Sequence, residues 1–164
     1  MLAGAAPPRV GSLIRALRAR LGEHVALIAS DGFADFERLI TAAGRAASGL
    51  YVANYGIPNG ELPPAGRRFL RELEATGRDP GPDFSAAYAA QAAVILLDAI
   101  ARSDGTRTSV TRELFRTNVE GGILGDLRFD ENGDLVEGPV TIFRIAGKQV
   151  VVDRVVSASL PTRP

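Results

Sequence analysis

Five consecutive apolar residues, Val25-Ala26-Leu27-Ile28-Ala29, stand between two stretches of helical periodicity, and this alternation constrains the fold more than any other feature. On both sides, apolar residues recur every three or four positions, which is typical of amphipathic helices, here over residues 8–21 and 33–43. A short, wholly apolar strand between two helices is typical of a parallel sheet covered on both faces. We therefore predict an α/β fold.

The remainder of the chain continues this alternation and then becomes rich in β structure. A strand over residues 49–55 precedes a helix over residues 64–76, and glycines and prolines at residues 77–82 indicate a linker or crossover. The helix predicted over residues 83–103 is apolar around most of its circumference, so we expect it to be buried on more than one side or to pack closely through its alanines. The predicted fold is a parallel sheet flanked by helices, with a C-terminal β-hairpin region. Its last strands are predicted at residues 127–129, 140–145 and 149–156.

Residues 125–134 combine several acidic side chains with the dipeptide Asn132-Gly133. Asn-Gly between two alternating apolar runs predicts a hairpin whose two turn residues both take positive φ. Spacing excludes a calcium-binding loop of the EF-hand type, which needs glycine at its sixth position and glutamate at its twelfth. Counted from Asp130, these positions hold Leu135 and Thr141. We therefore predict a structural hairpin and no metal site.

Composition excludes several classes of function. The chain has 164 residues, enough for one domain with a core, and its 19 basic residues balance its 19 acidic ones. A neutral chain lacks the basic surface that nucleic acid requires, so Arg15, Arg18 and Arg20 are interpreted as a solvated helix face. Cysteine is absent, which excludes disulfides and thiolate metal sites. No apolar run reaches the length of about twenty residues that spans a bilayer, and residues 1–8 lack the features of a signal peptide.

Enzymatic chemistry has no support in the sequence. His24 is the only histidine and no cysteine accompanies it, so a zinc site cannot be built around it. A Ser-His-Asp triad would need His24 as its base, but no G-x-S-x-G motif presents a nucleophile. P-loop and G-x-G-x-x-G motifs are also absent. We therefore predict no catalytic activity, no cofactor and no metal.

Asp31 is the strongest candidate for a binding residue. In parallel sheets, ligands lie outside the carboxyl ends of the strands, and Asp31 follows the apolar strand closely. A carboxylate at this position, near a helix N-terminus, is a preorganised negative charge. Capping of the following helix is an equally good use of Asp31. Ser30 is either a hydrogen-bond partner for a ligand carboxylate or a turn residue, and Phe33 is either a pocket wall or part of the core.

Three stretches, in their order and spacing, resemble the branched-chain amino acid (Leu/Ile/Val) binding family, which consists of type I periplasmic binding proteins of ABC transport systems. They are VALIASDGF at residues 25–33 with SGLYV at residues 48–52, YAAQAAVILLDAI at residues 88–100, and residues 125–134 with the strands that follow. The resemblance covers roughly residues 10–156. It implies that residues 10–78 and 140–156 are second-lobe-like and residues 83–135 first-lobe-like. The chain is then incomplete relative to the two-lobe fold, and we expect a shortened product of a longer gene, a homodimer or a domain-swapped assembly.

The resemblance implies an extracytoplasmic solute-binding component of an ABC transport system, which binds an amino acid or similar small polar ligand without catalysis and has an ABC permease as partner. In this family, an acidic residue at the position of Asp31 binds the ammonium group of the ligand. Asp83 and Phe84 correspond to the place where the family often has an aromatic ligand contact, and Asp83 departs from that pattern. Ala6 and Pro7 stand where the family offers another aromatic contact. These departures favour an alternative, a ligand-sensing or protein-interaction domain of a larger receptor with a degenerate cleft.

Overall fold

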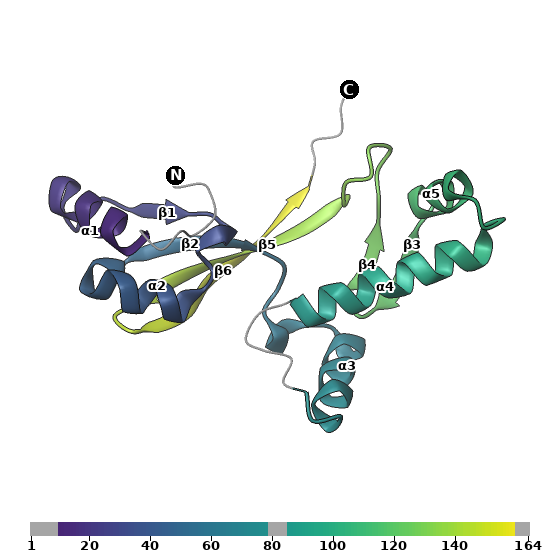
Figure 1. Ribbon diagram of the computed structural model, residues 1–164, viewed down its shortest axis with the longest axis horizontal. Coiled ribbons are helices and arrows are strands. Elements are labelled where there is room, and N and C mark those ends of the chain that lie inside the picture. The colour runs from purple at the N-terminus through teal and green to yellow at the C-terminus, as the bar shows by residue number, and fades with distance from the viewer. Residues whose placement is uncertain (1–9, 79–84, 160–164) are drawn as a thin grey trace. The chain divides into compact units, whose positions relative to one another are not determined.

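A computed structural model describes residues 10–78 and 85–159 of the chain (Figure 1). The chain divides into two compact units. Unit 1 is drawn from Met1–Gly56 and Pro139–Val156, and unit 2 from Ile57–Gly138 and Ser157–Pro164. The elements follow in the order α1 (Val10–Leu21), β1 (Leu27–Ala29), η1 (Asp31–Phe33), α2 (Phe36–Ala43), η2 (Gly44–Ala47), β2 (Leu50–Tyr55), η3 (Asn59–Glu61), α3 (Pro64–Ala75), α4 (Ser85–Arg102), α5 (Arg107–Phe115), β3 (Asn118–Gly122), β4 (Gly125–Arg128), β5 (Glu137–Ala146) and β6 (Gln149–Ser159), where η marks a short 3-10 helix.

A four-stranded sheet in the order β1-β2-β5-β6 forms the centre of unit 1. β1 and β2 are parallel, with Leu27 paired to Leu50, as expected for strands joined by a helical crossover. β5 pairs antiparallel with β2, where Val52 lies opposite Phe143. β6 lies beside β5 and follows it after a turn at residues 147–148. The α/β class is confirmed, and the sheet is mixed rather than wholly parallel.

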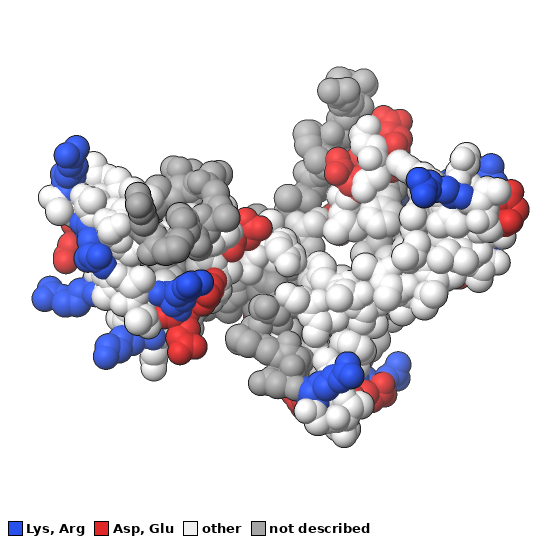
Figure 2. Space-filling view, viewed as in Figure 1, with Lys and Arg blue, Asp and Glu red and all other residues white. Residues whose placement is uncertain are grey.

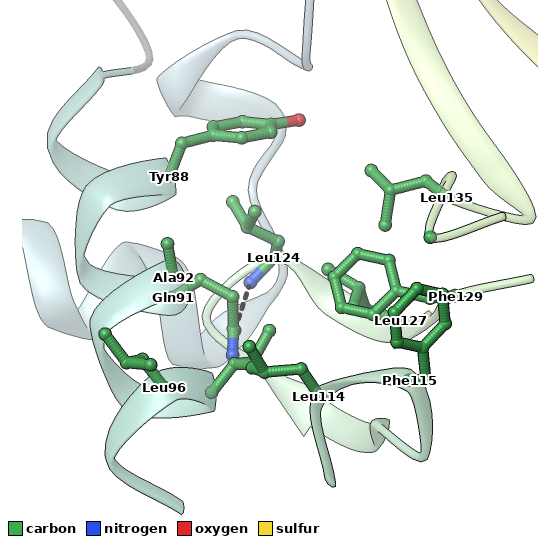
Figure 3. Close-up of a pocket in the computed structure, with 12 residues that line it drawn as sticks. Tyr88, Gln91, Ala92, Leu96, Leu114, Phe115, Leu124, Leu127, Phe129 and Leu135 are labelled. Atoms are coloured by element: carbon green, nitrogen blue, oxygen red, sulfur yellow. Dashed lines mark hydrogen bonds between the residues drawn. The ribbon is translucent and has the colours of Figure 1, made fainter. Parts of the chain in front are cut away.

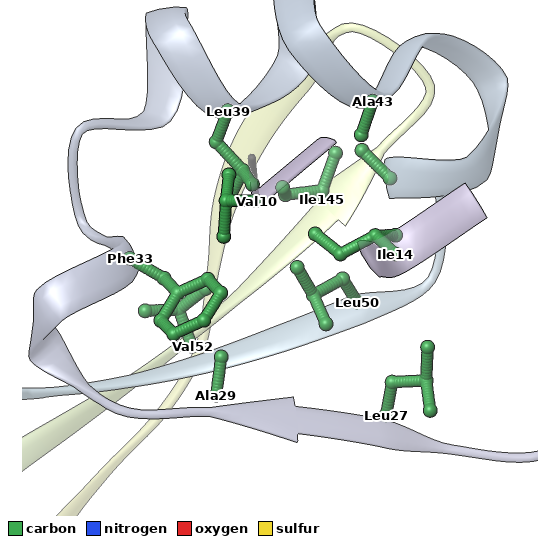
Figure 4. Packing of buried hydrophobic residues seen from close by; sticks show 11 residues of the cluster. Val10, Ile14, Leu27, Ala29, Phe33, Leu39, Ala43, Leu50, Val52 and Ile145 are labelled. Atoms are coloured by element: carbon green, nitrogen blue, oxygen red, sulfur yellow. The ribbon is translucent and has the colours of Figure 1, made fainter. Parts of the chain in front are cut away.

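The core of unit 1 lies between this sheet and the helices α1 and α2 (Figure 4). Burial alternates along β2: Leu50 and Val52 are buried, whereas Tyr51 is only half-buried. In β1, the side chain of Ile28 is 43% exposed, although both of its neighbours in the strand are buried. The expectation that the apolar strand is covered on both faces is therefore wrong for the described residues, because α1 and α2 both pack on the same face.

Arg18 of α1 is buried, which corrects its interpretation as part of a solvated face. Its guanidinium donates hydrogen bonds to the backbone carbonyl oxygens of Val25 at 2.6 Å, Ser48 at 3.3 Å and Ala46 at 3.5 Å. Val25 precedes β1 and Ser48 precedes β2, so Arg18 connects the amino ends of both strands to α1. The five N–H donors of arginine allow one side chain to satisfy several carbonyl groups at once.

Unit 2 contains α3, α4, α5 and the β3–β4 pair. Leu62, Leu70 and Ala87 form its buried cluster, which joins α3 and the residues before it to α4. The division between the units falls at Gly56, and the apolar side of α3 packs against α4. Gln91 of α4 is buried, and its Oε1 accepts a hydrogen bond from the backbone N–H of Leu124 at 3.3 Å. This bond connects α4 to the turn between β3 and β4.

The loop at residues 130–134 is closed by an isolated antiparallel bridge, but its turn differs from the predicted one. Gly133 has a φ of 86°, whereas no described residue other than glycine has a positive φ. The prediction that Asn132 also takes positive φ is therefore wrong. The carboxylate of Asp130 closes the loop instead, because it accepts hydrogen bonds from the backbone N–H groups of Asn132 and Asp134, each at 2.9 Å. An aspartate side chain that accepts hydrogen bonds from the backbone N–H groups after it stabilises a turn, so Asn132 need not take the left-handed conformation.

Gly11 of α1 lies against α2. A Cβ atom there would overlap the backbone carbonyl of Ala42. We expect Gly11→Ala to lower the free energy of unfolding by about 1–3 kcal/mol, since the crowding outweighs the gain in helix propensity. Gly60→Ala is the control, because Gly60 has open space around it. Urea denaturation followed by circular dichroism measures both variants, and equal stability of the two would contradict the prediction.

The loop held by Asp130 should open at acidic pH. Hydrogen bonds, above all from the backbone N–H of Asp134, hold the pKa of the Asp130 carboxyl below its ordinary value. A lowered pKa in the folded state means that the stabilisation is fully present above the unfolded pKa and is lost as the pH falls through the lowered value. The backbone amide shift of Asp134, followed by NMR, should report this loss. Asp130→Asn keeps an acceptor oxygen but cannot titrate in this range, so an unchanged acid transition in that variant would refute the assignment.

Candidate functional site

The carboxyl ends of β1 and β2 lie at the same edge of unit 1, because the two strands are parallel and in register. Ser30 and Asp31 follow β1 at this edge. The short helix η1 begins at Asp31 and packs against β2. Asn54 and Tyr55 end β2. The fold therefore gathers these polar residues of two segments at the edge where ligands bind in parallel sheets.

Asp31 is exposed, and its carboxylate has neither a hydrogen-bond partner nor an ion-pair partner within residues 10–78 and 85–159. Its backbone carbonyl accepts a hydrogen bond from the N–H of Ala34 at 2.8 Å, which fixes the loop while the side chain stays free. Asp35, not Asp31, caps α2, because the Asp35 side chain accepts a hydrogen bond from the backbone N–H of Arg38 at 3.3 Å. The capping interpretation of Asp31 is therefore wrong, and the interpretation as a binding residue remains.

Ser30 and Phe33 take different positions in the same loop. Ser30 is half-buried, its carbonyl accepts a hydrogen bond from the N–H of Phe33 at 3.0 Å, and its hydroxyl makes no capping bond to η1. The ring of Phe33 is only 4% exposed and belongs to the core, where it lies against Val52 and Ala29 (Figure 4). Phe33 therefore supports the loop from beneath, which agrees with the core interpretation of this residue.

Asn54 is a further polar residue at this edge, and the sequence analysis did not identify it as a candidate. It is 8% exposed, and its Oδ1 atom is buried without a hydrogen-bond partner among the described residues. An unpaired buried acceptor costs about 1–3 kcal/mol, so such groups usually meet a water molecule or a ligand. Its position at the end of a second predicted strand could have identified it, because the carboxyl ends of parallel strands lie at the same edge of a sheet.

The predicted residues Asp83 and Phe84 lie outside the described residues. The candidate site of unit 1 is the sheet edge that carries Ser30 and Asp31 after β1 and Asn54 and Tyr55 at the end of β2. An uncompensated carboxylate attracts a cationic group, and the neutral polar groups offer hydrogen bonds to the remainder of a small polar molecule. Within the described part of the chain, no three His, Asp or Glu side chains are grouped so that they could hold a metal ion.

Each unit also has a cavity. A cavity of about 710 Å³ in unit 1 is lined by Arg18, Arg45 and Lys148, near the amino ends of β1 and β2. A cavity of about 490 Å³ in unit 2 is lined almost wholly by apolar side chains of α4, α5 and the strand pair (Figure 3). Of the predicted site residues that the structure describes, Ser30, Asp31 and Phe33 line neither cavity. The polar edge at Asp31 is thus a separate feature of the molecule.

Comparisons with known proteins agree on one family. The family model described as "Periplasmic binding protein" matches residues 1–149. The structure of the leucine binding protein LivK from Thermotoga maritima matches with a TM-score of 0.73 and 28% identity, over 94% of this chain and 43% of that one. LivJ from Streptococcus pneumoniae, in complex with isoleucine, matches with a TM-score of 0.66 and 19% identity, over 95% and 43% of the two chains.

A branched-chain amino acid ABC transporter protein from Thermus thermophilus with bound valine shares the fold, with a TM-score of 0.59, 19% identity and coverage of 96% and 44%. None of the curated proteins is similar enough in sequence to count as a match. The chain spans less than half the length of the solved structures that it resembles. The family model covers most of the chain, and the fold agrees with type I periplasmic binding proteins. The chain therefore belongs to the periplasmic binding protein family.

Proposed function

We propose that this chain is the part of an extracytoplasmic solute-binding protein of an ABC transport system that supplies one wall of the ligand site. The ligand is an amino acid or a similar small polar molecule, the chain catalyses no reaction, and the partner of the whole protein is an ABC permease. The single observation that carries the proposal is the free carboxylate of Asp31 at the carboxyl edge of a parallel strand pair. Family membership supports it, as does the leucine binding of the Thermotoga protein.

The chemistry of the edge fits a zwitterion. The ammonium group of an amino acid is a compact cation that donates up to three hydrogen bonds, and Asp31 offers acceptor oxygens and a full negative charge. Ser30 provides a hydroxyl for the ligand carboxylate, and Asn54 provides an acceptor that has no partner in the described protein. Asp83 and Phe84 remain predicted ligand contacts by resemblance to the family. Closure around the ligand would then desolvate the charged groups and strengthen their interaction.

Calorimetric titration of the folded chain with leucine, isoleucine and valine tests the proposal. We expect Asp31→Asn to weaken the affinity by about tenfold to a hundredfold, because a hydrogen bond to a charged group contributes about 1.5–3 kcal/mol. The control is Glu37→Gln, which removes the same charge from an exposed position on α2 of the same unit. The control should bind as the unchanged chain does.

Two results would refute the proposal. If Asp31→Asn and the unchanged chain bind the amino acids with equal affinity, Asp31 does not contact the ligand. The absence of binding of any common amino acid to a chain that is folded by circular dichroism would favour the alternative, a sensory or interaction domain with a degenerate cleft.

A further inference from the structure

The amino ends of β1 and β2 border the cavity of about 710 Å³ in unit 1, and Asp31 does not line it. Two turns contribute to its wall, through Ser48 and Gly49 before β2 and through Gly147 between β5 and β6. The N–H of Gly49 donates to the carbonyl of Ile145 at 2.8 Å, and the N–H of Gly147 donates to Oγ of Ser48 at 3.4 Å. The two turns are therefore joined to each other, and the cavity has a fixed wall.

Positive charge dominates the lining of this cavity. Arg18, Arg45 and Lys148 contribute three cationic side chains, and Glu23 is the one carboxylate among the described residues that line it. The chain as a whole has equal numbers of acidic and basic residues, so the excess is local. Figure 2 shows Lys and Arg side chains along the end of unit 1 that carries α1 and the turn between β5 and β6. A cavity lined by one sign of charge concentrates ions of the opposite sign.

Arg18 supplies a buried charge that has no counterion in the described part of the chain. Its side chain is 9% exposed, and its hydrogen bonds with described residues all go to backbone carbonyl oxygens, those of Gly22 and Glu23 among them. No carboxylate within residues 10–78 and 85–159 forms an ion pair with it. Carbonyl groups satisfy the N–H donors but do not neutralise the charge, and buried charges are ordinarily paired. An anion in the cavity would provide the missing pair.

Arg45 and Lys148 bring two further charges to the same cavity. Both residues are exposed, and neither side chain has a hydrogen-bond or ion-pair partner among the residues that the structure describes. Arg45 lies in η2 and Lys148 in the turn between β5 and β6, so the fold collects them from separate segments. Like charges that share one cavity repel each other, and an anion between them relieves this repulsion.

We propose that this cavity, which we call the anion cavity, binds a small dianion of the phosphate type. Three cationic side chains and one carboxylate leave an excess of two positive charges, which matches a dianion. The cations come from α1, η2 and the β5–β6 turn, and a phosphate group presents acceptor oxygens in several directions, whereas a carboxylate presents two. Guanidinium groups bind phosphate oxygens in pairs, and lysine adds a point charge. The proposal is independent of the amino acid site at Asp31.

Titration of the chain with inorganic phosphate tests the proposal. The backbone amide shifts of Gly49 and Gly147, followed by NMR, report on the anion cavity from two of its segments. We expect both shifts to change and to reach saturation at the same phosphate concentration. Sodium chloride keeps the ionic strength constant, so that screening does not imitate binding. Glycerol phosphate and malonate, titrated in the same way, compare a phosphomonoester and a dicarboxylate with the free anion.

Charge-changing variants locate the binding. Arg45→Gln and Lys148→Gln should each weaken phosphate binding by about threefold to tenfold, because each removes a charged hydrogen-bond donor. Glu23→Gln should strengthen phosphate binding by about twofold to fivefold, because it removes the opposing charge. Arg38→Gln and Glu37→Gln are the matched controls, since they change the net charge equally at exposed positions of α2 that do not line the cavity. Both controls should bind phosphate as the unchanged chain does.

Shifts that do not saturate, or equal affinities of Arg45→Gln and Arg38→Gln for phosphate, would overturn the proposal. Tighter binding of malonate than of phosphate would also overturn it. If glycerol phosphate binds more tightly than inorganic phosphate, the ligand is a phosphomonoester, and the reverse order identifies the free anion. Binding of the chain to phosphatidylglycerol vesicles alone, lost in Arg45→Gln, would refute a small-molecule site and assign the cavity to a membrane surface. Leucine titration of the same variants measures the site at Asp31 separately, so that either proposal can fail without the other.

Discussion

The parallel register of β1 and β2 is the constraint on which the candidate site depends. It brings Asp31, which follows one strand, to the same edge as Asn54 at the end of the other. The register is held at the opposite end of the strands by Arg18, whose guanidinium bonds to carbonyl groups before both of them. The core under the sheet then fixes η1 through the buried ring of Phe33. The exposed carboxylate is thus positioned by a backbone that is anchored at both ends.

Much of this arrangement is predictable from the sequence, because it depends on periodicity and on strand ends. The apolar strand and its flanking helices predict the α/β class, and the position of Asp31 follows from that class. Capping geometry is not predictable to the residue, since Asp31 and Asp35 are both chemically suited to cap α2 and only the backbone decides between them. The burial of Arg18 is also not predictable from the sequence. A charged residue in an amphipathic helix is ordinarily solvated, and the carbonyl partners of Arg18 belong to other segments of the chain.

Unit 2 differs from the expectations drawn from the sequence at two elements. From its composition we expected α4 to be buried on several sides or to pack through its alanines; among the described residues one stripe is buried, and it includes Ala87 and Ala99. The composition of a helix therefore does not determine how many of its sides are buried. β3 was not predicted, because Asn118–Gly122 contains two glycines and forms a strand through its pairing with β4.

The antiparallel pairing of β5 with β2 has a consequence for the order in which the chain folds. β2 ends at Tyr55, and its neighbour in the sheet begins only at Glu137, so the central sheet of unit 1 needs residues separated by more than half of the chain. Contacts of such long sequence separation form slowly, because a large loop must close before they are gained. Unit 2, by contrast, is drawn mainly from the continuous stretch Ile57–Gly138. During synthesis, unit 2 can therefore fold before unit 1. The sheet of unit 1 is complete only after β5 has been synthesised and has paired with β2.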